Sequence, residues 1–292
     1  MQDKELLSPE ELYQRAVEVI RGGELSAYTD ELVSRLDFSL DIQNEEATDK
    51  DIAIGAHKLG GSPDVAPDFA WPCWNEEPLT FIAQFDLSSL TPLDPKGLLP
   101  TQGLLSFFSM LRPMGFEPED SMMHGVIGME PETRGAWRVV LSTTTSSLER
   151  RVSPLQNTVS AYPSQRISNV WSRIGLPDTY EVIAPDGIWD PDDFWGDIFD
   201  DYLDVCDGID MLCSHSCNHQ LLGYARYRQN DMREDAARFG ERNRKAMRLL
   251  AQFSSDGDRD LSFAGDGYGY FFIEENDLKV GDFSRSYFGV QR

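Results

Sequence analysis

The segment Ile82-Ala-Gln-Phe85 has a close copy later in the chain, Leu250-Ala-Gln-Phe253. A second pair of segments follows in the same order, because Gly103-Leu-Leu-Ser-Phe-Phe108 is matched by Gly267-Tyr-Gly-Tyr-Phe-Phe272. All four are apolar runs of the β-strand type. Two matches in one order, with nearly equal offsets, predict an internally duplicated β unit whose similar halves lie around a pseudo-two-fold axis.

The rest of the chain predicts a mainly β body with a helical start. Short β-type runs broken by proline and glycine fill residues 37 to about 185, for example at 38–42 and 137–141. Ser8 and Glu11 form a capping box before a helical apolar pattern, and a second short helix is expected from Asp30 to Leu36. We therefore predict an α+β fold, mainly β, with an N-terminal helix and a few peripheral helices.

The predicted organisation is one helical segment and one domain. The helical segment covers residues 1–36, and the domain covers 37–292. Within that domain, the two similar halves are expected at about 55–150 and about 219–292, with the acidic stretch 186–210 between them.

The charge of the chain restricts its partners. Among 292 residues there are 26 Lys and Arg against 50 Asp and Glu, a formal net charge of −24. This balance argues against binding to nucleic acid or to an anionic membrane, and it allows a basic protein as partner. The chain has no signal-peptide pattern, no run of about 18 apolar residues and only four cysteines, so we expect a cytoplasmic protein without a disulfide framework.

Two charged segments of opposite sign follow one another. The first, 186–210, is strongly acidic and also holds five aromatic residues, which predicts a short amphipathic helix that packs in part. The second, 226–248, is rich in arginine and is expected to be largely helical. One interpretation is that the basic helix packs against the acidic segment; the alternative is an exposed basic stripe that serves as a docking face.

Several segments together resemble a known family. They are Lys58-Leu-Gly-Gly61-Ser-Pro63, Pro67-Asp-Phe, Trp71-Pro-Cys-Trp74-Asn, Pro78-Leu-Thr-Phe81-Ile-Ala-Gln84, Gly103–Phe108, Trp137-Arg-Val139, His219-Gln-Leu-Leu-Gly223-Tyr, Leu249–Phe253, Gly267–Ile273, Asp277-Leu278 and Asp282-Phe283. This set resembles the YwqG-like family of bacterial proteins (DUF1963), a domain of unknown function. The resemblance implies an intracellular, mainly β fold with an internal repeat, and no reaction, since the family has no established activity. The chain departs from the pattern at 186–210 and 226–248.

The stretch from Lys58 to Trp74 is a rigid frame that holds two tryptophans. Paired glycines and several prolines restrict its backbone to turns and extended conformations. One interpretation is a stiff crossover packed on the sheet by its indole rings. The alternative is a ligand groove with Trp71 and Trp74 as its aromatic floor and with Lys58 and Gln84 as orienting polar groups. We also count His219, Gln252 and Asp266 among the candidate ligand- or partner-binding residues.

One cluster has the residue types of a metal site. Cys213, His215, Cys217 and His219 provide thiolate and imidazole groups, which zinc prefers, but paired Cys-x-x-Cys knuckles are absent. The alternative is small buried thiols beside a hydrogen-bonded histidine. The acidic run 256–260, with Asp266, resembles a calcium loop but lacks its glycine and terminal glutamate, so a turn between strands explains it more simply.

The sequence favours a binding protein over an enzyme. It contains no Gly-x-Ser-x-Gly elbow, no Walker loop and no His-Glu-x-x-His motif. We therefore expect no cofactor and a non-enzymatic protein-binding module, with an immunity or antitoxin-like role against a basic toxin as the specific hypothesis. The alternatives are a metalloprotein or thiol enzyme that uses Cys213–His219, and a small-ligand binder at Trp71 and Trp74.

Overall fold

The structure is a computed structural model. It describes residues 6–111, 128, 130–143, 145–154, 162–213, 217–255, 263 and 266–292. The described helices are α1 (Pro9–Gly22), α2 (Thr29–Ser34), α3 (Leu87–Leu90), α5 (Thr179–Val182), α6 (Pro191–Asp193), α7 (Phe199–Asp210), α8 (Met232–Gly240) and α9 (Glu275–Val280). The described strands are β1 (Asp37–Glu46), β2 (Lys58–Leu59), β3 (Asp64–Val65), β4 (Cys73–Trp74), β5 (Glu77–Pro78), β6 (Thr80–Asp86), β7 (Leu104–Ser109), β8 (Trp137–Ser142), β9 (Glu149–Arg150), β10 (Gln165–Gly175), β11 (His219–Leu222), β12 (Met247–Ser254), β13 (Tyr268–Glu274) and β14 (Tyr287–Gln291).

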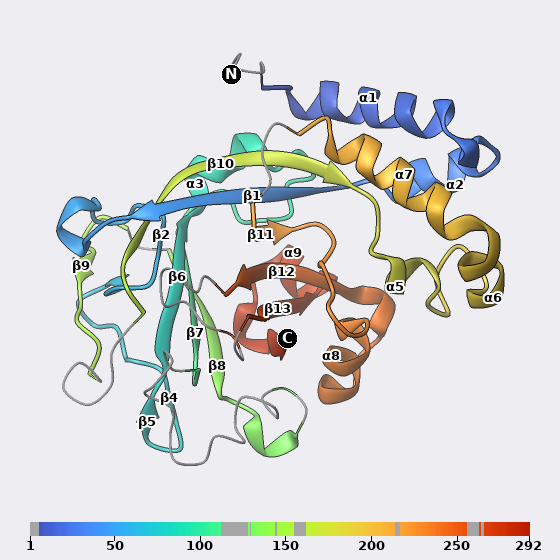
Figure 1. Cartoon of the computed structure of the whole chain (residues 1–292). Coiled ribbons are helices and arrows are strands. Elements are labelled where there is room, and N and C mark those ends of the chain that lie inside the picture. The colour runs from blue at the N-terminus through green and yellow to red at the C-terminus, as the bar shows by residue number, and fades with distance from the viewer. Residues whose placement is uncertain are drawn as a thin grey trace.

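A 10-stranded antiparallel sheet forms the body, in the order β14-β13-β12-β11-β1-β10-β2-β6-β7-β8. The long strands β1 and β10 pair at its centre and cross the whole molecule (Figure 1). One arm of the sheet continues from β10 through β2 to β8, and the other continues from β1 through β11 to β14. The prediction of a mainly β fold is confirmed.

The two arms curl toward one another over an aromatic core. Phe107 on β7 lies with its ring centroid 5.0 Å from that of Phe271 on β13 and 5.5 Å from that of Phe253 on β12. Farther out, the indole N–H of Trp137 on β8 donates to the carbonyl of Ser286 just before β14, at 2.8 Å. Rings from both arms are therefore buried against each other, and this packing closes the body.

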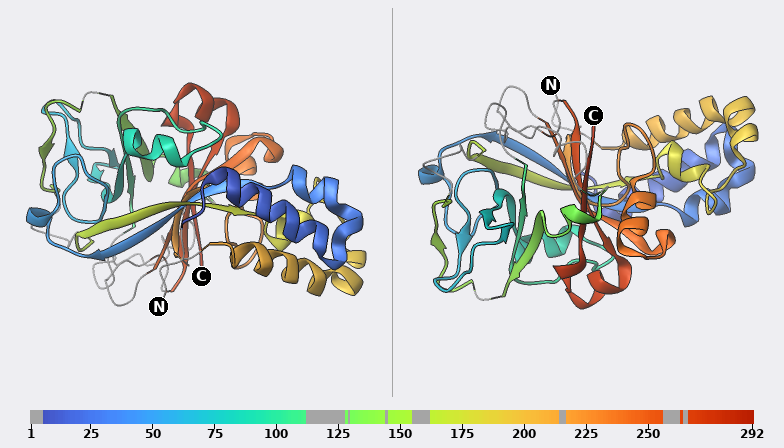
Figure 2. Two further views of the ribbon diagram at one scale, coloured as in Figure 1. Left: turned by 90° about the horizontal axis from the view of Figure 1, so that it is seen from above. Right: turned by 90° about the horizontal axis from the view of Figure 1, so that it is seen from below.

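The helices α1 and α7 form a second layer at one end of the sheet. Ser8 caps α1, and the predicted capping box with Glu11 is present. Leu12 and Ile20 of α1 belong to the same buried cluster as Val205 and Ile209 of α7. Figure 2 shows these helices projecting from one end of the β body. Helix α2 ends at Ser34, and β1 begins at Asp37.

One helical prediction is wrong in its extent. The Arg-rich segment 226–248 is α-helical only over Met232–Gly240, with a short 3-10 helix at Arg244–Ala246. Met247 and Leu249, which follow the helix formers in sequence, lie instead on β12 and are each 2% exposed. Their burial against the sheet outweighs the local preference for helix.

Matching hydrogen bonds are found in the two arms. The imidazole Nδ1 of His57 accepts from the backbone N–H of Asp86 at 3.0 Å, and Nδ1 of His219 accepts from the N–H of Ser254 at 3.1 Å. Both β6–β7 and β12–β13 have a register shift, next to Ala83 and Ala251 respectively.

The match extends to the buried glutamines and to the turns. The Oε1 of Gln84 accepts from the N–H of Asp64, and the Oε1 of Gln252 accepts from the N–H of Arg226, both at 2.8 Å. Gly61 and Gly223, three residues before those donors, have left-handed φ values of 68° and 69°. These correspondences support the predicted duplication, which stays a hypothesis about the origin of the fold.

No helix within the described part of the chain has the length and apolar character that crossing a bilayer requires.

Phe107 provides a test of the aromatic core. We expect Phe107→Ala to lower the free energy of unfolding by about 3–5 kcal/mol, because the fully buried ring joins both arms. Urea unfolding at pH 7 measures the change. Tyr13→Ala on α1, where the ring is 36% exposed, is the control and should change stability by less than about 1 kcal/mol. Equal effects of the two substitutions would contradict the proposed role of the core.

Candidate functional site

Residues 191–210 of the acidic stretch form a continuous helical region that presents carboxylates to solvent. It begins with α6, continues through a π-helical turn (Phe194–Ile198) and ends with α7. One side of α7 packs into the cluster with α1 through Tyr202, Val205 and Ile209, as the predicted amphipathic helix requires. On the exposed surface lie Asp192, Asp193, Asp200, Asp204 and Asp207.

Apolar side chains run along the same exposed surface. Trp195 is 50% exposed and its ring centroid lies 4.9 Å from that of Phe199, while Leu203 is 37% exposed. These three residues recur every four positions, so on a helix they fall along one line. We call them, together with the five aspartates named above, the acidic ridge.

Most arginines of the Arg-rich segment are held in close ion pairs within the chain. Arg244 pairs with Asp186 of the acidic stretch and lies 2.9 Å from Asp231. Arg233 reaches Asp231 at 2.7 Å and Glu181 at 2.9 Å. Further ion pairs involve Arg226, Arg238, Arg242 and Arg248. Only Asp186 of the acidic stretch is engaged by these arginines, so the five aspartates of the acidic ridge have no ion pair in the described part of the chain.

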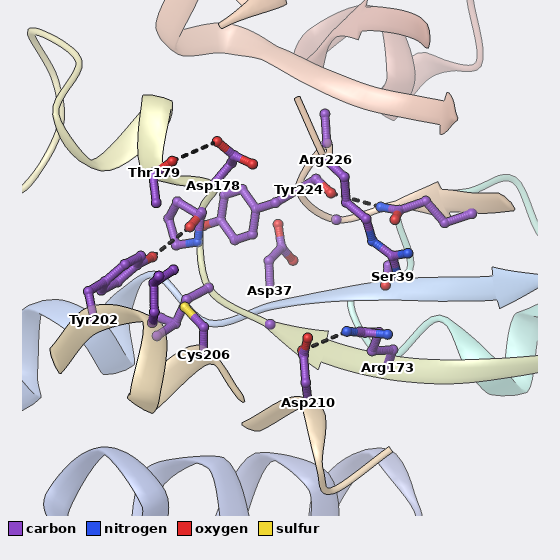
Figure 3. A pocket seen from close by; sticks show the side chains of 17 residues that line it. Asp37, Ser39, Arg173, Asp178, Thr179, Tyr202, Cys206, Asp210, Tyr224 and Arg226 are labelled. Atoms are coloured by element: carbon purple, nitrogen blue, oxygen red, sulfur yellow. Dashed lines mark hydrogen bonds and ion pairs between the residues drawn. The ribbon is translucent and has the colours of Figure 1, made fainter. Parts of the chain in front are cut away.

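A cavity of about 230 Å³ lies between α7 and the sheet. Its walls come from the start of β1, the end of β10, α7 and the turn after β11 (Figure 3). The charged residues that line it are Asp37, Arg173, Asp178, Asp210 and Arg226. Tyr202, Leu203 and Tyr224 supply much of its apolar surface.

Asp178 is the carboxylate of this cavity that lacks a cation. Burial raises the pKa of Asp178 to about 6, although it accepts hydrogen bonds from the N–H groups of Tyr180, at 3.0 Å, and of Tyr227, at 3.4 Å. Within the described residues it has no ion pair. The other carboxylates of the cavity are engaged, since Asp37 lies 2.6 Å from Lys96 and Asp210 lies 2.6 Å from Arg173.

Lys58 and Gln84 lie in a closed polar network and not in an open groove. Both side chains are fully buried. The ammonium of Lys58 pairs with Asp49 at 2.6 Å and also donates to the carbonyl of Ser62. The amide Nε2 of Gln84 donates to Asp64, at 2.7 Å, and to a backbone carbonyl, at 2.8 Å. Their polar groups are therefore satisfied inside the protein, and a ligand role for them stays a prediction.

Trp71 and Trp74 support the hairpin of β4 and β5. The indole N–H of Trp71 donates to the carbonyl of Leu79 at 2.9 Å, and its ring lies edge-on to Phe108 at 5.8 Å. Trp74 is half-buried and packs against the main core. These contacts are the ones expected of a stiff crossover packed on the sheet by its indole rings. The ligand groove at Trp71 and Trp74 stays a prediction.

The three further candidates lie in the second arm. His219 is 3% exposed and Gln252 is fully buried, in adjoining strands of the sheet. Their acceptor atoms are used by backbone N–H groups, as described above, while Nε2 of Gln252 has no hydrogen-bond partner among the described residues. Asp266 is exposed. The acidic run 256–260 lies outside the described residues.

The cysteine and histidine cluster can be examined only in part, because His215 lies outside the described residues. Among those that are described, no three His, Cys, Asp or Glu side chains are grouped as a metal site would require. Burial raises the pKa of the Cys213 thiol, and it raises that of Cys217 to about 11. Because the thiolate is the reactive form of cysteine, these environments disfavour a nucleophilic thiol.

A serine and a histidine meet elsewhere, in the wrong tautomer for catalysis. The Nε2 of His57 lies 2.8 Å from the hydroxyl of Ser89. The backbone N–H of Asp86 donates to Nδ1, so in the neutral ring Nε2 carries the proton and donates it to Ser89. The hydroxyl of Ser89 in turn donates to the carbonyl of Asp86 at 2.9 Å. His57 is therefore not arranged as a general base for this serine.

The sequence analysis did not identify the cavity. Its walls come from four separate segments, around residues 37–39, 173–179, 202–210 and 220–226, which no local pattern connects. Asp178 has only a local signal, as the N-cap of the short helix α5. The acidic ridge, by contrast, is visible in the alternation of aspartates and aromatic residues along one segment.

These features define a mainly β protein with a curled antiparallel sheet, a helical cover at one end and a small cavity between them. The chain belongs to the family described as a domain of unknown function (DUF1963), whose model matches residues 57–291. The family resemblance noted from the sequence is thereby confirmed. No curated protein matches the chain.

We expect Lys58→Met to lower the free energy of unfolding by about 3 kcal/mol, since the substitution leaves the Asp49 carboxylate without its cation and a buried carbonyl without its donor. Urea unfolding at pH 7 measures the change. Lys50→Met, at an exposed position nearby, removes the same charge and should change stability by less than about 0.5 kcal/mol. A loss below 1 kcal/mol for Lys58→Met would show that the network is not structural.

The raised pKa of Asp178 predicts a pH-dependent effect on stability. Because the folded state holds this proton more tightly than the unfolded chain, Asp178 favours folding at low pH, and that contribution is lost as the pH rises from about 4 to about 6. Asp178→Asn keeps an oxygen to cap α5 but cannot ionise. We expect the variant to gain about 2.5 kcal/mol on the parent protein between pH 4 and pH 7. Urea unfolding of both proteins at pH 4 and at pH 7 measures this gain. A difference in unfolding free energy between the two proteins that is the same at both pH values would contradict the prediction.

Proposed function

We propose that this protein recognises a basic, amphipathic segment of another protein through the acidic ridge. The observation that carries the proposal is the exposure of Trp195 and Leu203, in line with the partly buried Phe199 and bordered by aspartates, on a helical region whose other side is packed. Large apolar side chains at the surface mark interaction sites when they are grouped.

The charge of the ridge defines its partner. Its five aspartates have no ion pair within the described residues, whereas most arginines of 226–248 are held by the chain's own carboxylates. A lysine- or arginine-rich partner would complement the unpaired carboxylates and would be steered to them by the net charge of −24. Basic residues alone would leave the apolar line uncovered, so the partner segment also carries an apolar side.

The apolar line would supply the anchors. A tryptophan surrounded by polar groups is the residue type that contributes most to many protein interfaces. Trp195 lies on the π-helical turn, next to Phe194, which is fully buried. The backbone that presents the indole is thus held by the core, and little ordering is needed when a partner binds. The predicted immunity or antitoxin-like role would make the partner a basic toxin.

A synthetic peptide tests the proposal directly. The probe is a fluorescent 14-residue helix with leucine on one side and lysine on the other, and its anisotropy is followed during titration with the protein. We expect micromolar affinity at 50 mM salt that weakens at least tenfold at 500 mM salt. Binding should also shift the tryptophan emission, and Trp195→Phe should remove that shift.

Two charge variants distinguish the ridge from the overall acidity. Asp200→Asn/Asp204→Asn/Asp207→Asn should weaken peptide binding at least tenfold. The control Glu10→Gln/Glu18→Gln/Glu24→Gln removes the same charge from exposed positions in the N-terminal helical segment and should weaken it less than twofold. Equal losses in both variants, or no binding by the parent protein, would contradict the proposal.

A further inference from the structure

We propose that the cavity between α7 and the sheet is a binding site for a small monocarboxylate, held by Arg226 and Ser39. This site shares only Leu203 with the acidic ridge, and the inference needs no partner protein. It rests on an incompletely bonded guanidinium, a cavity-lining hydroxyl without a bond to any described residue, and a comparison between the two arms of the sheet.

Arg226 has more hydrogen-bonding capacity than the described residues use. Its side chain donates to the carbonyl of Cys217 at 2.6 Å, and its nearest carboxylate oxygen, on Asp41, is 3.8 Å away. A guanidinium has five N–H donors, arranged to hold a carboxylate by two parallel bonds. Its neighbour Arg173 is better satisfied, since it reaches Asp41 at 3.1 Å and Asp210 at 2.6 Å. Arg226 is therefore the cation that a ligand would find available.

Ser39 adds a hydroxyl at the same cavity. The residue is more than nine-tenths buried, at 8% exposed, yet its hydroxyl makes no hydrogen bond to any described residue. Figure 3 shows Ser39 and Arg226 on the same side of the cavity. This hydroxyl opens onto the cavity, so a ligand oxygen beside it could accept a hydrogen bond that no described residue takes.

The first arm of the sheet, which runs from β2 to β8, shows which groups occupy the place that corresponds to this cavity. There the carboxylate of Asp49 accepts from the Lys58 ammonium at 2.6 Å and from the N–H of Ser62 at 2.9 Å. By the register of the strands and the glutamine bonds described above, Lys58 corresponds to Gln220 and Asp64 to Arg226. Both Gln220 and Arg226 line the cavity. The first arm thus encloses a carboxylate of its own, and the second arm leaves a cavity with a guanidinium.

The other residues that line the cavity determine which chemical group can accompany the carboxylate of the ligand. Leu176, Pro177, Tyr202, Leu203 and Tyr224 provide aliphatic and aromatic surface, and about 230 Å³ suits a molecule smaller than a typical drug. Asp178 contributes a carboxylate without a cation, so a second negative charge on the ligand would be repelled. These features favour one carboxylate on a small aromatic or aliphatic group.

Isothermal titration calorimetry with phenylacetate tests the inference, in a carboxylate-free buffer at pH 7.5 and 150 mM NaCl. The neutral isostere phenylacetamide is the control ligand. We expect phenylacetate, or one of the shorter probes butyrate and acetate, to bind at least tenfold more tightly than its amide. No carboxylate binding up to 10 mM, or equal binding of acid and amide, would overturn the proposal.

Variants of the protein connect any binding to the two residues. Arg226→Gln should weaken carboxylate binding at least tenfold, and Ser39→Ala, which removes one oxygen atom, should weaken it several-fold. Arg228→Gln is the matched control, because Arg228 packs on the ring of Tyr268 at 4.7 Å and does not line the cavity. Thermal unfolding confirms that each variant is folded. Unchanged affinity in both Ser39→Ala and Arg226→Gln would overturn the assignment.

Discussion

The pairing of β1 with β10 is the constraint on which the rest of this structure depends. The two strands pair from Asp37 and Gly175 at one end to Glu46 and Gln165 at the other. Each then carries one arm of the sheet on its free edge, β11 on β1 and β2 on β10. A slip of one residue would turn every side chain of a strand to the opposite face, so this register positions both arms, the helical cover and the cavity between them.

Local patterns in the sequence predicted the individual helices and strands better than they predicted which strands pair with each other. The capping box at Ser8 and the strand-forming runs at 38–42, 79–85 and 137–141 depend on neighbours in sequence, and the structure confirms them. The β1–β10 pairing joins segments more than a hundred residues apart, and no local pattern specifies it. The Arg-rich segment shows the opposite failure, since burial of Met247 in the sheet overrides a composition that favours helix.

The same distinction applies to the candidate sites. The acidic ridge could be anticipated because its aspartates and aromatic residues alternate along one stretch of chain. The cavity could not, because Ser39, Asp178 and Arg226 come from three separate segments and meet only through the sheet. Lys58 illustrates a different limit. Its place in a distinctive motif suggested a ligand contact, which stays a prediction, while the ion pair of its ammonium with Asp49 joins two separate segments that no local pattern connects.

The two arms of the sheet share a backbone arrangement but differ in how their buried polar side chains are paired. In the first arm Gln84 has acceptors for its amide, and the surrounding charges are paired, so the network is closed and rigid. In the second arm Nε2 of Gln252 has no partner within the described part of the chain, and Arg226 stands at the position that corresponds to Asp64. An unpaired buried amide costs about 1–3 kcal/mol, which argues that stability alone did not shape this arm. The proposed carboxylate site lies beside this arm, in the cavity that Arg226 lines.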